Sequence, residues 1–346
     1  MTQENALLEV DGLKTYFYLE EGDVRAVDGV SFSMSKQEVV GVVGESGCGK
    51  SVLARSIMRI VQPPGETIEG NITYHKTTNS GSEKTDLLSL PNNGHEIRRI
   101  RGGEIAMVFQ EPMVSFSPVH TIGNQIIEMI LLHNNDVDKK EARSQAISLL
   151  EKVGIPNAEM RIDEYSFRLS GGMRQRAMIA LALSCNPGLL IADEPTTALD
   201  VTTQAQILKL MQDLQEEFGM GMILITHNLG VVAQMTDRII VMYLGKIVEI
   251  ADTKTLFENP KHPYTQELLR SIPTLSREKS SERLTAIEGS VPPPFYRPSG
   301  CMFHPRCPKA IRGTCDVIEP QPIEISTGHQ TSCLLYDETL EKAQVK

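Results

Sequence analysis

Residues 44–51 have the types and the spacing of a phosphate-binding loop. They read Gly-Glu-Ser-Gly-Cys-Gly-Lys-Ser and fit the pattern G-x-x-x-x-G-K-[ST] in full. Glycines let the backbone curl so that successive N–H groups converge on an anion, and the start of a following helix adds partial positive charge. In such a loop Lys50 reaches the β- and γ-phosphates, and the Ser51 hydroxyl ligates Mg²⁺. We therefore assign the whole loop to nucleotide binding: Gly44, Glu45, Ser46, Gly47, Cys48, Gly49, Lys50 and Ser51.

The residues on either side of this loop predict the elements that hold it. Residues 39–43 are apolar without interruption, which is typical of a buried parallel strand. Residues 51–60 place Leu53 and Ile57 at helical spacing. A strand before the loop and a helix after it favour a phosphate site over a glycine-rich turn that binds nothing.

Two adjacent carboxylates, Asp193 and Glu194, follow a second apolar run at residues 189–192. In a phosphate-loop protein such a pair has two roles: Asp193 holds Mg²⁺, and Glu194 orients or deprotonates the attacking water. Because side chains alternate in direction along a strand, one carboxylate can face the metal and the other the water. The alternative is a pair of solvated charges at a strand end.

Other candidate residues stand at the carboxyl ends of strands, where α/β sheets place their ligand groups. Gln110 follows an apolar strand at residues 104–109, and His227 follows another at residues 222–225. Taken alone, Gln110 would be a turn residue and His227 a structural histidine. In the first, antiparallel β segment we expect Phe17 to stack on an adenine ring, with core packing as the equal alternative.

Residues 122–183 recur at helical spacing and predict a helical insertion between strands. Within it Ser170 can cap a helix, and Gly171 and Gly172 expose backbone N–H groups at the start of that helix. This is a second helix start that suits an anion. Asp200 follows the paired carboxylates and precedes an amphipathic helix.

These landmarks together resemble the nucleotide-binding subunit of an ATP-binding cassette (ABC) transporter. The phosphate loop, Gln110, the Leu-Ser-Gly-Gly signature beginning at Leu169, the paired carboxylates and His227 follow in that family's order and spacing. The signature is the most specific of them, because it separates this family from other phosphate-loop ATPases.

The resemblance implies a role for each candidate. ATP would lie between the phosphate loop of one subunit and the signature of a second, in a homodimer or a heterodimer. Gln110 would sense Mg²⁺ and couple to the membrane subunits, and His227 would contact the γ-phosphate. The catalytic residues are then Glu194, His227 and Gln110, and the Mg²⁺ ligands are Ser51, Gln110 and Asp193. The remaining nucleotide contacts are Phe17, Ser170, Gly171, Gly172 and Asp200.

Further segments resemble the oligopeptide/dipeptide branch of bacterial importers, some of which handle nickel. They are residues 44–47, residues 110–113 and residues 260–265. The resemblance implies an α/β fold with a phosphate-loop NTPase core, an antiparallel β subdomain, an inserted α-helical subdomain and a small Cys-containing C-terminal extension. We place the ATP-binding domain at 1–256, its helical subdomain at about 111–183, and the extension at 257–346.

The implied function is ATP hydrolysis coupled to the uptake of dipeptides, oligopeptides or related solutes by a membrane importer. The implied partners are a second ATPase subunit, two integral-membrane permeases and an extracytoplasmic solute-binding protein. Such a chain is peripheral to the cytoplasmic face of the cell membrane. One departure from the family is Cys48, which stands where serine is commoner; we expect activity with thiol sensitivity.

Four of the six cysteines lie in the C-terminal segment, at Cys301, Cys307, Cys315 and Cys333. No C-x-x-C pair, the usual mark of structural zinc, is present, whereas iron–sulfur clusters need no closely paired ligands. Residues 301–308 also resemble the tail motif of this branch, which implies a [4Fe–4S] cluster. We expect that cluster on the four thiolates; zinc completed by His304 or His329, and free or reversibly oxidised thiols, are the alternatives.

Composition argues against other classes. The formal charge of the 346 residues is −10, so the chain has no global basic footprint for nucleic acid. The longest apolar run, at residues 177–183, is far shorter than the ~20 residues that span a bilayer, and the N-terminus lacks the features of a signal peptide. One rival is a DNA-repair or chromosome-organising ATPase, which shares these motifs but needs long insertions and a basic surface. Another is a translation-associated cassette protein, but those join two cassettes in one chain and only one is present here. An exporter subunit is the alternative that stays open.

Overall fold

The structure is a computed structural model that describes residues 5–78, 81–111, 115–197, 199–271 and 287–339. The chain divides into two compact units, which we describe separately. The carboxylate unit comprises residues 1–9, 33–39 and 72–225, and the phosphate-loop unit comprises residues 10–32, 40–71 and 226–346. Pro112 and Met113 of the predicted 110–113 motif lie outside the described residues.

The phosphate-loop unit is built on strand β3 (Val39–Val43), whose five residues are all buried. Strand β9 (Arg238–Tyr243) runs parallel to it, with Val43 opposite Val241. Strand β10 (Lys246–Asp252) then pairs antiparallel with β9. An uninterrupted apolar run of this kind suits a strand covered on both faces, so the predicted buried strand is confirmed.

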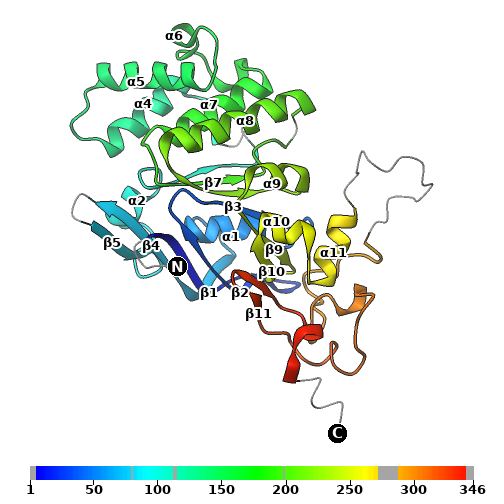
Figure 1. The fold of residues 1–346 in the computed structure, drawn as a ribbon. Helices are drawn as coiled ribbons and strands as arrows, with labels where there is room; N and C mark the ends of the chain where they lie inside the picture. Colours follow the sequence, from blue (N-terminus) through cyan, green and yellow to red (C-terminus); the bar gives the residue numbers. More distant parts are fainter. Residues whose placement is uncertain (1–4, 79–80, 112–114, 198, 272–286, 340–346) are drawn as a thin grey trace, which may run out of the picture. The chain divides into compact units, whose positions relative to one another are not determined.

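A second, antiparallel sheet has the strand order β2-β1-β4-β5 (Figure 1). Its strands are β1 (Ala6–Leu19), β2 (Gly22–Ser35), β4 (Gly65–Thr78) and β5 (Gly81–Asp86). The turn between β1 and β2 contains Gly22, which has a φ of 137°. The predicted antiparallel β segment is confirmed.

The carboxylate unit combines three parallel strands with most of the helices. The strands are β6 (Ile105–Val108), β7 (Leu189–Asp193) and β8 (Gly221–Ile225), paired in the order β8-β7-β6. The helices are α2 (His95–Ile100), α4 (Ile122–His133), α5 (Lys139–Lys152), α6 (Ala158–Arg161), α7 (Gly171–Leu183) and α8 (Val201–Phe218). Figure 1 shows α4, α5, α7 and α8 gathered together, as the helical spacing predicts.

The C-terminal extension continues the sheet of the phosphate-loop unit. Strand β12 (His329–Thr331) pairs antiparallel with β10, and β11 (Ile323–Ser326) pairs with β12. Helices α9 (Leu229–Met235), α10 (Thr253–Glu258) and α11 (Pro263–Arg270) belong to the same unit. Among the helices described, none combines the length and apolar character that crossing a bilayer requires.

Three aromatic rings form the core between the extension and the rest of its unit. Tyr243, Tyr264 and Phe303 are all buried, and their ring centroids lie 4.7 to 5.3 Å apart. Tilted and edge-to-face pairs at such distances are favourable beyond the area that they bury. The extension therefore folds onto a hydrophobic core, although its own segment is poor in apolar residues.

Candidate functional site

The phosphate loop has a backbone that only glycine can adopt at its two ends. Gly44 and Gly49 have φ values of 151° and 101°. A Cβ on Gly44 would lie 2.3 Å from the Met242 carbonyl oxygen, and one on Gly49 would lie 2.0 Å from that of Ala26. Helix α1 (Lys50–Ile57) begins directly after Gly49, without a side-chain cap. A helix start without a side-chain cap, preceded by a glycine loop, is typical of a phosphate site.

Lys50 lies inside this loop, with only 5% of its surface exposed. Its ammonium donates to the carbonyl oxygens of Gly44, at 2.9 Å, and Glu45, at 3.1 Å. The remaining N–H points at the Cys48 sulfur, 3.7 Å away, which is a weak acceptor. A phosphate oxygen is a stronger acceptor than this sulfur, so the Lys50 ammonium is placed to donate to a bound nucleotide instead of to Cys48.

His227 and Phe17, the two other residues of this unit that we expect to contact nucleotide, differ in exposure. Thr226 donates its backbone N–H to Val42 at 3.4 Å, so the exposed His227 follows at the strand end where the phosphate loop starts. Phe17 is half-buried, and its ring lies 2.5 Å from where a Cβ on Gly65 would be. Close packing of the ring agrees with the core alternative, and its contact with adenine stays a prediction.

In the carboxylate unit the polar ends of two strands meet. Gln110 follows β6 and Glu194 follows β7, and the Gln110 side-chain amide donates to a Glu194 carboxylate oxygen at 3.3 Å. The Thr197 hydroxyl donates to the same oxygen at 2.9 Å. Asp193 is the last residue of β7 and is buried. Thr197 is a residue that our sequence reasoning missed, although its position three residues after Glu194 in a turn was visible.

Glu194 does not continue the strand, contrary to our alternation argument. Its φ is 47°, the left-handed region that a non-glycine residue adopts at a cost of order 1 kcal/mol or more. Its backbone N–H donates to the Ile225 carbonyl at 2.9 Å, which holds the turn. The chain therefore turns at Glu194, directly after the buried Asp193, instead of continuing the strand.

The signature residues pack against the start of the next long helix. Ser170 caps α7 by accepting from the Met173 N–H at 3.4 Å, as predicted. A Cβ on Gly172 would lie 2.8 Å from a Thr203 methyl carbon. Asp200 caps α8 through the Thr203 N–H and hydroxyl, and these hydrogen bonds hold the pKa of Asp200 below its usual range. Asp200 thus has a structural role as a helix cap, and its contact with nucleotide stays a prediction.

The prediction of an iron–sulfur cluster is wrong. Within the described ranges, no group of three or more His, Cys, Asp or Glu side chains is placed to hold a metal ion. All four tail cysteines are free thiols: Cys301, Cys307, Cys315 and Cys333. Burial raises the pKa of Cys301 to about 11 and that of Cys333 to about 12, which favours the neutral thiol over the thiolate that metals require.

The energetic argument for the cluster also fails. Metal ligation could supply folding energy to a segment that lacks a core, but the extension packs on the aromatic core around Phe303. The zinc alternative also lacks a site, because no group of three or more His, Cys, Asp or Glu side chains in the described part of the chain is placed to hold a metal ion. Free or reversibly oxidised thiols, the remaining alternative, stay a prediction.

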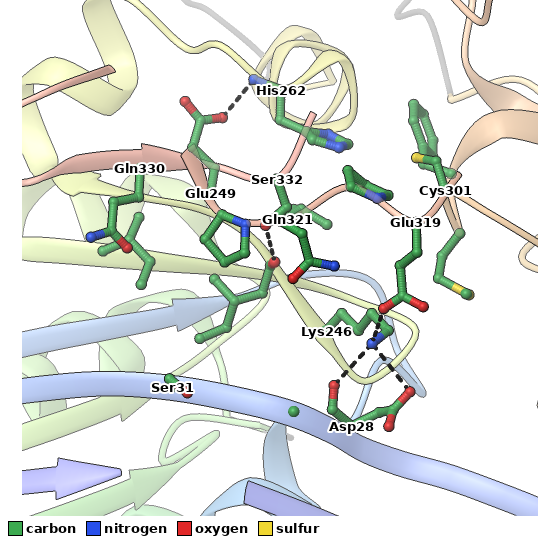
Figure 2. A pocket seen from close by; sticks show the side chains of 18 of the residues that line it. Asp28, Ser31, Lys246, Glu249, His262, Cys301, Glu319, Gln321, Gln330 and Ser332 are labelled. Atoms are coloured by element: carbon green, nitrogen blue, oxygen red, sulfur yellow. Dashed lines mark hydrogen bonds and ion pairs between the residues drawn. The ribbon is translucent and has the colours of Figure 1, made fainter. Parts of the chain in front are cut away.

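A cavity of about 130 Å³ lies between β10 and the extension (Figure 2). Lys246 reaches across it to Glu319, at 2.6 Å, and to Asp28, at 3.3 Å. Asp28 also binds Arg297 at 2.9 Å. Burial opposes ionisation of Asp28, but the Tyr16 hydroxyl and these cations keep its pKa below the usual range. The charges here are paired within the protein, and the lining residues include none of residues 44–51.

We expect the free energy of unfolding to depend on pH because of His262, which lies on the wall of this cavity. Its Nδ1 accepts from the Tyr264 N–H at 3.1 Å, and burial lowers its pKa from 6.5 to about 3. Between these values the unfolded chain binds a proton that the folded chain does not, so stability falls as the pH falls. From pH 7 to pH 5 this side chain should remove about 2 kcal/mol of the unfolding free energy.

The measurement is urea unfolding at both pH values for the wild type and for His262→Asn. Asparagine keeps a capping acceptor but does not titrate. We expect the variant to lose about 2 kcal/mol less than the wild type over this pH interval. Equal losses in the two proteins would contradict the assignment of a buried, neutral His262.

Comparison with protein-family models finds two matches along the chain. Residues 27–197 match the model described as ABC transporter. Residues 248–315 match the model described as oligopeptide/dipeptide transporter, C-terminal region. The first match includes the phosphate loop and both carboxylates, and the second includes His262 and three of the tail cysteines.

Curated relatives are similar along almost the whole chain. The oligopeptide transport ATP-binding protein AppD of Bacillus subtilis is 52% identical over 96% of this chain and 98% of its own. The dipeptide transport ATP-binding protein DppD of Escherichia coli is 46% identical over 95% and 96%.

Solved structures are similar in fold. The dimeric structure of MJ0796, a bacterial ABC transporter cassette, has a TM-score of 0.61 at 25% identity, covering 71% of this chain and 99% of that one. The structure of cbiO1 from Clostridium perfringens, part of the cbiONQ transporter complex, has a TM-score of 0.59 at 25% identity, covering 74% and 92%.

Proposed function

The chain belongs to the ABC transporter family as an ATP-hydrolysing subunit, and on that premise we propose that it powers the import of peptides. The observation that carries the proposal is the match of residues 248–315 to the C-terminal region of oligopeptide/dipeptide transporters. AppD and DppD, whose names assign them to oligopeptide and dipeptide transport, support the same substrate class.

We assign the ATP site as follows. The loop amides and Lys50 hold the phosphates, because the loop fits an anion and the ammonium already lies within it. Ser51 and Asp193 supply oxygen ligands of the kind that Mg²⁺ prefers. Glu194 orients or deprotonates the water, supported by the hydrogen bond that Gln110 donates to it. His227 contacts the γ-phosphate. Hydrolysis of this kind depends mainly on positioning and charge stabilisation.

We further propose the assembly. A second ATPase subunit, identical or similar, completes each nucleotide site with its Ser170, Gly171 and Gly172, and the dimeric cassette of MJ0796 supports this arrangement. Two membrane permeases hold the chain at the cytoplasmic face of the cell membrane, and a solute-binding protein delivers the peptide. Peptide selectivity then lies in those partners.

The test is reconstitution of the full chain with its permeases and binding protein in lipid vesicles that contain ATP. We expect uptake of labelled di- or oligopeptides that stops when ATP is replaced by ADP. ATP hydrolysis without peptide uptake, together with uptake of Ni²⁺ under the same conditions, would overturn the peptide assignment.

A further inference from the structure

Three sequence segments that suggested the importer branch meet at one point of the phosphate-loop unit. They are Glu45 in the phosphate loop, Tyr264 in residues 260–265 and Arg306 in residues 301–308. Their functions are not explained by the ATP site as we have assigned it. Since Glu45 and Arg306 are 261 positions apart, only the fold brings them together.

Arg306 binds the Glu45 carboxylate with two nitrogens. The distances are 2.7 Å from Nη1 to one oxygen and 3.0 Å from Nη2 to the other. The Arg306 side chain is only 4% exposed, so water screens this pair weakly. A bidentate, charge-assisted pair with little exposure is among the stronger polar contacts in proteins, unlike an ion pair at an open surface.

The extension also fixes Arg306 itself. Its Nε donates to the Glu288 carbonyl at 3.1 Å, and its Nη1 lies 3.3 Å from the Tyr243 hydroxyl. The hydrogen bonds to Glu45 and Tyr243 raise the pKa of Arg306, so its charge is permanent. The guanidinium is thereby held by Glu288 of the extension and Tyr243 of β9, at the position where it pairs with the loop.

The backbone of Glu45 is held from a second direction. The Tyr264 hydroxyl accepts the Glu45 N–H at 2.9 Å, and Tyr264 is fully buried in the aromatic core. The Glu45 carbonyl oxygen in turn accepts from the ammonium of Lys50 at 3.1 Å. The side chain, the N–H and the carbonyl of one loop residue are therefore all engaged, two of them by the C-terminal extension.

The negative charge of Glu45 affects how the loop binds phosphate. A carboxylate within an anion-binding loop repels phosphates, and at short range in a partly buried site this repulsion is substantial. Arg306 neutralises it. Resting on the proposed function, we propose that the C-terminal extension is a positioning element of the ATP site, in which Arg306 cancels the charge of Glu45 and, with Tyr264, holds the loop ready for nucleotide.

The proposal predicts a rescue. Arg306→Gln leaves Glu45 charged and unpaired beside the phosphates, and we expect the Kd for ATP to rise about tenfold. Adding Glu45→Gln removes the charge that needed cancelling, so the double variant should recover most of that loss. Arg312→Gln, at an exposed arginine of the same extension, is the control and should bind ATP as the wild type does.

The measurement is calorimetric titration of the full-length chain with Mg·ATP at low temperature, with melting temperatures taken without nucleotide. A purely structural Arg306 would lower the melting temperature and leave the Kd of the folded protein unchanged, which would overturn the proposal. A raised Kd that Glu45→Gln does not restore would overturn it too.

Two further outcomes are kept distinct. If Arg306→Gln does not fold, Arg306→Lys replaces it: lysine keeps the charge but loses the bidentate geometry. A Kd within about threefold of the wild type supports charge cancellation, while a Kd raised tenfold or more overturns it. A wild-type chain that fails to bind ATP would instead overturn the proposed function, on which this inference rests.

Discussion

Glu194→Gln is expected to bind ATP as the wild type does and to hydrolyse it roughly 10²- to 10⁴-fold more slowly, the range for loss of a general base. The substitution keeps the shape of the side chain. Its amide oxygen can still accept from Gln110 and Thr197, which donate to the carboxylate at 3.3 and 2.9 Å. What is lost is the negative charge to which we assign the orientation or deprotonation of water.

Two measurements on the full-length chain test this: phosphate release at saturating Mg·ATP, and the ATP retained after gel filtration. We expect slow release together with a trapped nucleotide. Glu151→Gln, on an exposed position of α5, is the matched control and should hydrolyse ATP normally. Unimpaired hydrolysis in Glu194→Gln would show that Glu194 is not the base.

Much of this site was predictable because its parts are local. The strand, loop and helix around residues 44–51 are consecutive, and each has its own signal: an apolar run, glycines, and helical spacing. The convergence of Gln110 and Glu194 also followed from a local observation, since parallel strands that end together bring their next residues to one edge. The predicted helix cap at Ser170 depends only on residues 170–173.

What could not be predicted depends on tertiary structure. The positive φ of Glu194 arises where its N–H meets Ile225 of the neighbouring strand, and no period in the sequence reports such a turn. The prediction of an iron–sulfur cluster in the C-terminal segment was wrong because it considered the spacing of the cysteines and not the residues that pack around them in the fold. Phe303 packs on Tyr243 and Tyr264, which lie far earlier in the chain, and this burial favours neutral thiols.

The second large effect is expected at Lys50. Lys50→Ala should raise the Kd for Mg·ATP by roughly 100-fold, because it removes a buried positive charge from the phosphates. The structure adds a further reason. The ammonium joins the two ends of the loop by donating to Gly44 and Glu45, so alanine removes both the contact with phosphate and a bond that closes the loop.

The matched control is Arg55→Ala. Arg55 is another cation of α1, in its last turn and exposed, and its loss changes the net charge equally without altering the loop. We expect this variant to bind Mg·ATP with the affinity of the wild type, while Lys50→Ala stays folded by circular dichroism and shows the raised Kd. If both variants lost the same affinity, the effect would be one of overall charge, and the placement of Lys50 at the phosphates would be wrong.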